Sequence, residues 1–235
     1  MYYIYIDEAG RGPIAWPVTV GAMVEKIEQP LWLERFQRVA VLWQKKKRGQ
    51  ERVQIDSSLY NLFPANDKSI YDACCDSKLL TEVQREFLYE QLQKINTADV
   101  SPTSKCFYTA SISADDIDTH GMTWVLRTAI VQIVEQVTTD RSQVVLIVDW
   151  PFDFWLRKEK AATVVPVIDG DAHIPMISAA SILAKVTRDR YMTELAKTHP
   201  QYWFEKHKWY GTKEHYDAIQ EYGIVEWTHR KTYIK

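Results

Sequence analysis

Apolar and polar positions follow two different periods along this chain, and each period predicts one kind of element. Alternation, or a short continuous apolar run, predicts strands. These strands cover residues 2–7, 17–24, 105–112, 144–148 and 162–168. Apolar residues spaced three and four apart predict amphipathic helices. The helices cover residues 81–95, 122–137, 175–197 and 212–222, with Thr81 and Thr212 as caps.

The order of these elements predicts the fold class. The first two strands are expected to pair as a hairpin, and strands then alternate with helices. This order predicts an α/β protein with a mixed β-sheet flanked by helices. We expect one catalytic domain over residues 1–198 and a helical C-terminal region, 199–235, that packs on the same domain. Residues 26–72 fit neither period, and we interpret them as an insertion.

Composition narrows the class of protein further. The chain has 235 residues, a net charge of −2, 46% hydrophobic and 26% charged residues, which excludes a disordered or membrane-spanning chain. Three cysteines form no disulfide framework, and the first residues lack the features of a signal peptide, so we expect a cytoplasmic protein. Near-neutral charge does not predict general nucleic-acid affinity, although it allows a local basic groove.

Glycine and tryptophan occur in unusual numbers. The chain has eight glycines, about half of the roughly 7% share that is usual. It has nine tryptophans, more than its glycines.

Four acidic residues stand at the end of a predicted strand or shortly after one. They are Asp7, Glu8, Asp149 and Asp171. Taken alone, each also suits a turn or a helix cap. Together, carboxylates at one sheet edge are tolerated mainly when divalent cations neutralise them. Two hard cations held by carboxylates suit phosphodiester hydrolysis, and oxygen ligands favour Mg²⁺ or Mn²⁺ over Zn²⁺.

Other segments have the chemistry of phosphate or nucleic-acid contact. The Gly10-Arg11-Gly12 turn offers backbone N–H groups and a guanidinium to a phosphate. Residues 199–211 (HPQYWFEKHKWYG) interleave basic and aromatic side chains, which suits backbone contact and stacking. Core aromatics with solvated charges explain that segment equally well. For Lys185, an ordinary surface ion pair is the alternative.

Taken together, the motifs resemble ribonuclease HII, the type 2 ribonuclease H family. The matching stretches lie in family order over nearly the whole chain. They are DEAGRGPIAWPV (7–18), DSKLL (76–80), LIVD (146–149), GD with SAASILAKVTRDRYM (170–192), HPQYWFEKHKWYGT (199–212) and HRKTY (229–233). The Gly-Arg-Gly turn resembles the HII branch more than the HIII branch.

The resemblance implies a ribonuclease H-like fold and an endonuclease that leaves 5′-phosphate and 3′-hydroxyl ends. The implied substrates are RNA–DNA hybrids and duplex DNA with single embedded ribonucleotides, in replication and repair. The implied cofactors are two divalent cations, Mg²⁺ or Mn²⁺. No membrane partner is implied, and we expect a monomer.

The resemblance also assigns roles to individual residues. The catalytic and metal-binding acids would be Asp7, Glu8, Asp149 and Asp171. The substrate-binding residues would be Gly10, Arg11, Gly12, Ser77, Lys78, Lys185, Lys208 and Tyr210, with Lys185 and Lys208 the weaker assignments. Gly10, Arg11 and Gly12 would meet the 2′-hydroxyl, the group that distinguishes RNA from DNA.

Four tryptophans depart from the family pattern, because they stand where the family has glycine. They are Trp16, Trp150, Trp203 and Trp209. Three interpretations remain open: an active nuclease, a catalytically impaired hybrid-binding homologue obstructed by these side chains, and a homologue that performs other two-metal chemistry. A further hypothesis is that these positions are UGA codons read as glycine in the source organism.

Overall fold

A computed structural model describes residues 1–26, 74, 77–98, 107–149, 162–167 and 169–234. The predicted insertion at about 26–72 and Trp150 lie outside the described residues, apart from Lys26 at the end of a strand. Nothing in the structure therefore bears on the insertion, and the proposed division at residue 198 stays a prediction.

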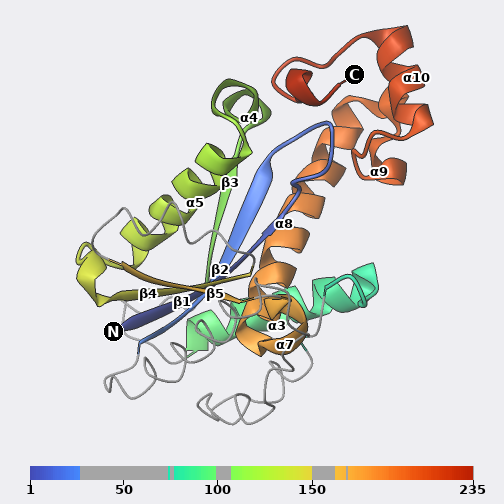
Figure 1. The fold of residues 1–235 in the computed structure, drawn as a ribbon. Helices are drawn as coiled ribbons and strands as arrows, with labels where there is room; N and C mark the ends of the chain where they lie inside the picture. Colours follow the sequence, from blue (N-terminus) through green and yellow to red (C-terminus); the bar gives the residue numbers. More distant parts are fainter. Residues whose placement is uncertain (27–73, 75–76, 99–106, 150–161, 168, 235) are drawn as a thin grey trace, which may run out of the picture.

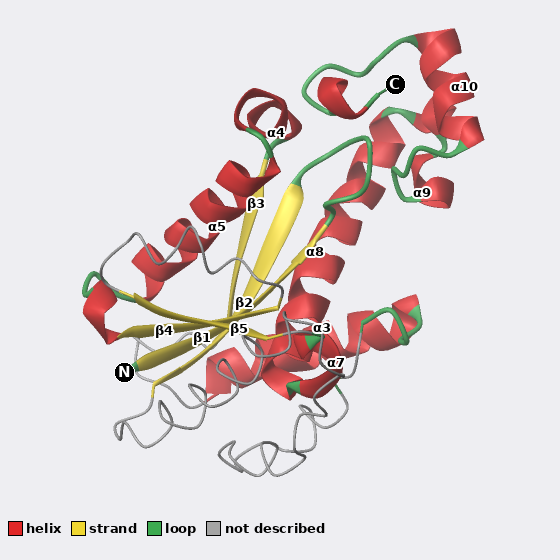
Figure 2. Ribbon diagram, viewed as in Figure 1, coloured by secondary structure: helices red, strands yellow, loops and turns green. Residues whose placement is uncertain are grey.

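Five strands form one mixed sheet, as the sequence predicts. They are β1 (Tyr2–Ala9), β2 (Val18–Lys26), β3 (Phe107–Ile112), β4 (Val144–Asp149) and β5 (Ala162–Val167). The strand order is β3-β2-β1-β4-β5 (Figure 2). Strand β1 pairs antiparallel with β2, which confirms the hairpin, and parallel with β4. The carboxyl ends of β1 and β4 therefore meet at one edge of the sheet.

Helices cover both faces of this sheet (Figure 1). They are α3 (Glu82–Ala98), α4 (Ala114–His120), α5 (Met122–Val137), α7 (Gly170–His173), α8 (Pro175–Thr198), α9 (Phe204–His207) and α10 (Lys213–Tyr222), with short 3₁₀ turns η4 (Arg141–Gln143), η5 (Pro200–Tyr202) and η6 (Lys231–Tyr233). Thr81 and Thr212 cap α3 and α10 as predicted. The sequence did not predict α4. Among the described helices, none has the length and apolarity to cross a bilayer.

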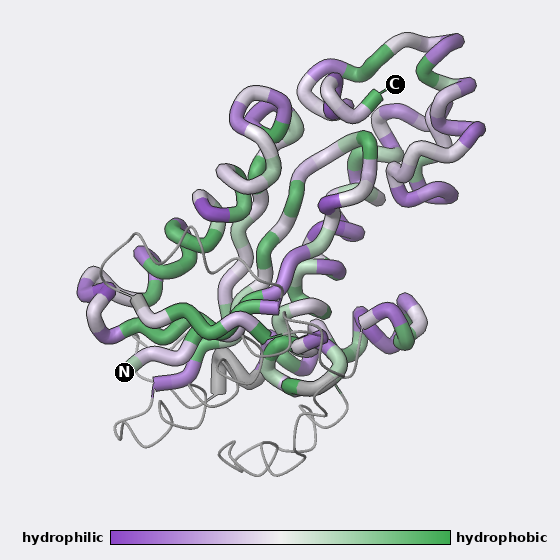
Figure 3. Tube along the Cα trace, in the orientation of Figure 1, coloured by the Kyte–Doolittle hydropathy of each residue, from purple (hydrophilic) through white to green (hydrophobic). Residues whose placement is uncertain are grey.

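The alternation of β1 divides the core between the two faces. Tyr3 and Tyr5 point into the cluster that includes α8, whereas Ile4 and Ile6 point into the cluster that includes α5. Figure 3 shows hydrophobic stretches along the strands and through α5. Because side chains alternate along a strand, Asp7 follows Tyr3 and Tyr5 onto the α8 face.

A third apolar cluster lies at the far end of α8. It joins the segment after β1 to the C-terminal region and is rich in aromatic rings. Its buried members are Ala15, Trp16, Met192, Ala196, Tyr202, Phe204, Trp209 and Ala218. An isolated β-bridge between Ala15 and His229 connects the N-terminal and C-terminal segments that contribute to this cluster. We call this group of residues the C-terminal cluster.

Candidate active site

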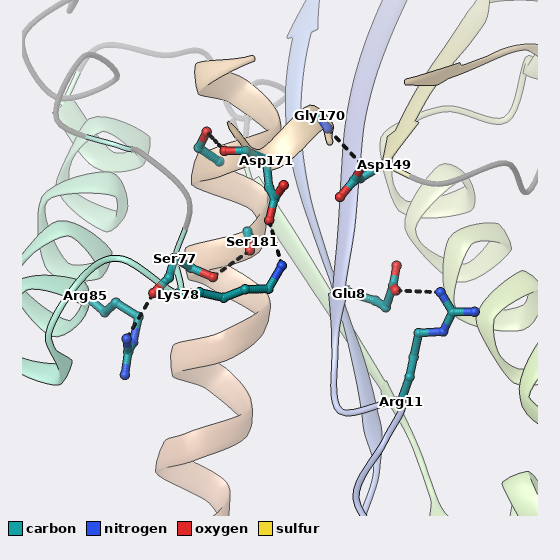
Figure 4. A network of polar contacts seen from close by, with 10 residues as sticks. Glu8, Arg11, Ser77, Lys78, Arg85, Asp149, Gly170, Asp171 and Ser181 are labelled. Carbon is teal, nitrogen blue, oxygen red and sulfur yellow. Dashed lines mark hydrogen bonds and ion pairs between the residues drawn. The ribbon is translucent and has the colours of Figure 1, made fainter. Parts of the chain in front are cut away.

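Three of the four predicted acids meet at the carboxyl edge of the sheet, and Figure 4 shows two of them, Asp149 and Asp171. One carboxylate oxygen from each of Asp7, Asp149 and Asp171 lies within 4.8 Å of the others. Asp7 comes from β1, Asp149 ends β4, and Asp171 lies in α7, just after β5. Three segments that are distant in the sequence thus supply one cluster of oxygen ligands.

Backbone geometry holds two of these acids in place. The Gly170 N–H donates to Asp149 Oδ1 at 2.9 Å. The Ser178 hydroxyl donates to the Asp171 carbonyl at 2.6 Å, and thereby ties α7 to the first turns of α8. The carboxylates therefore project from fixed backbone rather than from a free loop.

Burial and mutual repulsion make the cluster costly in its charged form. Burial raises the pKa of Asp7 well above its usual range, and the adjacent Glu8 charge raises it further. Burial also raises the pKa of Asp149 to about 6, and the Asp171 charge contributes in the same direction. Raised carboxyl pKa values in close proximity indicate negative charge that a cation would stabilise. The all-oxygen donor set fits hard cations such as Mg²⁺ or Mn²⁺.

Glu8 lies beside this cluster but is not one of the three acids. Its carboxylate pairs with Arg11, with Arg11 Nη1 3.2 Å from Glu8 Oε1. Burial raises the pKa of Glu8, and the Arg11 charge partly offsets that rise. The structure thus connects the acidic residues directly to the Gly10-Arg11-Gly12 turn.

Ser77 and Lys78 approach the acids from the segment before α3. Lys78 Nζ lies 3.2 Å from Asp171 Oδ2. The hydroxyls of Ser77 and Ser181 are 2.9 Å apart, and Ser181 in turn hydrogen-bonds the Asp7 carboxylate, which lowers the Asp7 pKa against the effect of burial. Both predicted residues therefore lie at the acidic cluster.

The Gly10-Arg11-Gly12 turn and Tyr210 come together on the side facing the C-terminal region. A side chain at Gly12 would lie 3.4 Å from the Tyr210 ring. Gly10 has φ 97°, and a Cβ there would collide with the Arg188 guanidinium. Tyr210 is half exposed, which leaves ring surface for a ligand.

The remaining two predicted residues pair elsewhere. Lys185 Nζ binds Asp189 Oδ1 at 2.8 Å within α8, an ion pair as the alternative expected, although Asp189 is buried rather than on the surface. Lys208 Nζ lies 3.6 Å from Glu82 Oε2 at the start of α3. Neither contact joins these lysines to the acids.

Sequence reasoning missed two buried arginines that brace the turn. Arg230 donates to the backbone carbonyls of Gly10, Arg11, Pro13 and Trp16. Arg188 donates to the carbonyl of Pro17 at 3.3 Å. Both lie in matching stretches, 170–192 and 229–233, but their partners are backbone atoms far away in the sequence, so the motifs did not reveal this bracing role.

Comparison with solved structures identifies the class of fold. The ribonuclease H2 of Pyrococcus horikoshii superposes with a TM-score of 0.60 at 23% identity, covering 99% of this chain and 93% of that one. A ribonuclease HIII crystallised in complex with Mn²⁺ (Bst-RNase HIII) superposes with a TM-score of 0.54 at 12% identity, covering 99% and 67%. The fold is that of the type 2 ribonucleases H.

Sequence comparison then identifies the family. The ribonuclease HII family model matches residues 72–235. Ribonuclease HII of Fusobacterium nucleatum is 32% identical over 99% of this chain and 85% of its own length. Ribonuclease HII of Bacillus cytotoxicus is 31% identical over 99% and 68%. The chain therefore belongs to the ribonuclease HII family, which confirms the predicted family and its enzyme class, an endonuclease.

Proposed function

We propose that this chain is a divalent-metal-dependent endonuclease that cuts the RNA strand of RNA–DNA hybrids and cuts at single ribonucleotides in duplex DNA. The observation that supports it most is the group of carboxylate oxygens from Asp7, Asp149 and Asp171 within 4.8 Å of one another. The products would be 3′-hydroxyl and 5′-phosphate ends, made during replication or repair.

The acids would hold two Mg²⁺ or Mn²⁺ ions. Bound divalent cations supply activation of the attacking water and charge stabilisation for the leaving oxygen. Asp7, Asp149 and Asp171 would provide the ligands, with Glu8 completing the set from beside them. Lys78 already offsets the charge of Asp171 and is largely exposed, so it is available to contact a substrate phosphate.

The turn and Tyr210 would distinguish RNA from DNA. The Gly10, Arg11 and Gly12 backbone can approach a sugar closely, since two of these residues carry no side chain. The 2′-hydroxyl donates and accepts hydrogen bonds, which deoxyribose cannot do at that position. The half-exposed ring of Tyr210 lies against Gly12, so a sugar held at the turn would contact it.

The catalytically impaired alternative has no support in the observations. Trp16 and Trp209 are buried in the C-terminal cluster, so neither indole projects from the surface as an obstruction. All four acids of the implied set are present. A protein that only binds nucleic acid gains nothing from carboxylates grouped against phosphate.

The proposal is tested with three matched duplexes: an RNA–DNA hybrid, a DNA duplex with one ribonucleotide, and the same duplex without it. We expect Mg²⁺- or Mn²⁺-dependent cleavage of the first two and none of the third. Absence of cleavage by the folded protein rejects the proposal. Equal cleavage of the all-DNA duplex instead indicates other two-metal chemistry.

A further inference from the structure

Most of the described tryptophans adopt a backbone conformation that favours glycine. Four of the five have positive φ: 79° at Trp16, 49° at Trp203, 68° at Trp209 and 65° at Trp227. Only a few per cent of non-glycine residues have positive φ, and a bulky side chain there is an outlier. Glycine adopts this region without steric cost.

The local geometry at three of these positions independently calls for glycine. Trp16 precedes Pro17, and residues before proline are normally restricted to extended backbone. Trp203 is the left-handed residue that ends η5, a position where glycine is the usual choice. Trp227 is the third residue of a turn closed by the Thr228 N–H on the Val225 carbonyl at 3.2 Å, where positive φ again favours glycine.

The indole rings gain little to offset this strain. The Nε1 atoms of Trp16 and Trp209 are buried without a hydrogen-bond partner, and buried indole N–H groups usually have one. The ring centroid of Trp209 is only 3.2 Å from that of Phe204, closer than the roughly 4.5–7 Å of favourable aromatic pairs. Trp227 is 70% exposed. Trp16 does stack on Tyr191, with ring centroids 4.4 Å apart, but such a contact contributes only about 0.5–1.5 kcal/mol.

Trp124 provides the internal contrast. It lies in the first turn of α5, and it is the one described tryptophan without positive φ. The centroid of its ring lies 4.1 Å from that of His120. The backbone therefore separates the described tryptophans into two groups.

We propose that the natural protein carries glycine at positions 16, 203, 209 and 227, each encoded by a UGA codon that the source organism reads as glycine, and tryptophan at 124. A single codon explains why one replacement type recurs at glycine-like backbone positions. The proposal adds position 227, which the motif comparison did not reveal. Position 150 lies outside the described residues and rests on the motif alone.

The first test compares the gene with the protein isolated from its source cells. Codons 16, 203, 209 and 227 should be UGA and codon 124 should be UGG. Peptide masses should show glycine at those four positions and tryptophan at 124. UGG codons at the four positions, or peptides with tryptophan there, would overturn the proposal.

A second test uses recombinant protein and does not depend on activity. Replacing the four tryptophans together (Trp16→Gly, Trp203→Gly, Trp209→Gly and Trp227→Gly) should raise the thermal unfolding midpoint, or convert an insoluble chain into a soluble one. The matched control Trp124→Gly should lower the midpoint, because glycine weakens a helix. A lower midpoint in the fourfold variant would contradict the proposal.

A separate observation concerns Arg230, whose guanidinium is fully buried. Nη2 donates to the Gly10 carbonyl at 2.6 Å, and Nη1 donates to those of Arg11 at 3.1 Å and Pro13 at 2.9 Å. The backbone N–H of Arg230 donates to the Ile14 carbonyl at 2.9 Å. A guanidinium presents five N–H donors in a rigid plane, which a lysine does not reproduce.

We infer that Arg230 is a positioning residue that fixes the Gly10-Arg11-Gly12 turn for ribonucleotide recognition. This inference rests on the proposed function, which places the 2′-hydroxyl at that turn. Arg230 touches the backbone of the turn rather than the acids. It should therefore affect substrate preference and leave metal binding unchanged.

The test measures equilibrium binding to duplexes with and without one ribonucleotide, together with Mn²⁺ affinity. In folded Arg230→Lys, the preference for the ribonucleotide should fall by on the order of 10- to 100-fold, as for other small misplacements, with Mn²⁺ affinity unchanged. The control Arg190→Lys changes an exposed ion pair with Glu86 and should alter neither. An unchanged preference in Arg230→Lys overturns the inference. Absence of any preference in the unsubstituted protein overturns the proposed substrate as well.

Discussion

The acidic edge of the sheet and the C-terminal cluster both contain buried groups that lower the stability of the fold, but the physical cause differs between them. At the sheet edge, Asp7, Asp149 and Asp171 are close together, and the cost is electrostatic. In the C-terminal cluster, Trp16 and Trp209 have positive φ, and the cost is steric. A bound cation can relieve the first cost, whereas only a different residue can relieve the second.

The pKa values of ionisable groups in the two regions also shift in opposite directions. In the C-terminal region, Val225 N–H donates to His229 Nδ1 at 2.8 Å, which places the His229 proton on Nε2. That atom is 3.1 Å from His215 Nε2, and His215 Nδ1 is 2.9 Å from the Tyr210 carbonyl. Burial lowers the pKa of both histidines to about 4. The pair is therefore neutral when folded, whereas in the other region the pKa values of Asp7 and Asp149 are raised.

The largest expected effect is on the acidic edge. Asp149→Asn removes a charged ligand while keeping the side-chain shape, so cleavage should fall by more than the roughly 10–100-fold typical of groups that merely orient a metal ligand. Initial rates on the single-ribonucleotide duplex provide the measurement. Asp217→Asn is the control, since Asp217 pairs with Lys213 on the surface of α10. Cleavage retained in Asp149→Asn would remove the acids from the proposed chemistry.

The next effect is acid destabilisation of the C-terminal region. Because the folded pKa of the histidines lies below the unfolded value of 6.5, their contribution is present above pH 6.5 and is lost as pH falls toward 4. Protonating either histidine should cost about 2–3 kcal/mol. Denaturant unfolding of His229→Gln across this window should show a smaller pH dependence than the unsubstituted chain. An equal dependence would assign the acid sensitivity to other groups.

Tyr210 links the two regions, and its loss should have an intermediate effect. Tyr210→Ala should weaken binding of the ribonucleotide duplex by about tenfold, since ring stacking contributes roughly 1–3 kcal/mol. Tyr222→Ala removes a similarly exposed ring on α10 and should leave binding unchanged. Fluorescence anisotropy without divalent metal measures both. Similar losses in the two variants would point to general destabilisation instead.

The smallest effect is the metal-free stability of the acidic edge. Because the folded pKa of Asp149, about 6, lies above the ordinary value of 3.8 for an aspartate, its favourable contribution is present below pH 3.8 and is lost as pH rises through 6. Because Asp149 is only partly buried and solvent screens its charge, the loss should be only about 1 kcal/mol, or a few degrees in the unfolding midpoint. Asp149→Asn should remove this dependence, and Mn²⁺ should offset it in the unsubstituted chain. A midpoint that responds to neither change would contradict the charge-repulsion account.

The grouping of acids at the edge of the sheet could be predicted from the sequence, because it depends on local patterns along the chain. Asp7 and Asp149 each end an apolar strand, and parallel neighbouring strands bring such ends together. Asp171 follows the last predicted strand by a few residues, so the same pattern of acids at strand ends indicated it. The helix α4 was missed because its sequence, ADDIDTH, has little apolar periodicity.

The C-terminal cluster was less predictable because its causes are distant in the sequence. Arg230 serves backbone carbonyls more than 200 residues away, and backbone atoms leave no residue pattern. The motif comparison gave Trp16, Trp203 and Trp209 as departures from glycine, but position 227 appeared only when its φ was known. Lys185 and Lys208 stay predictions as substrate contacts, although each has an acidic partner in the structure.

One measurement tests the central claim most directly: mapping the cut in a DNA duplex that contains a single ribonucleotide. We predict incision only when Mg²⁺ or Mn²⁺ is present, at the phosphodiester on the 5′ side of the ribonucleotide. The new ends should be a 3′-hydroxyl and a 5′-phosphate. Incision in the presence of a chelator, or at positions unrelated to the ribonucleotide, would contradict the account.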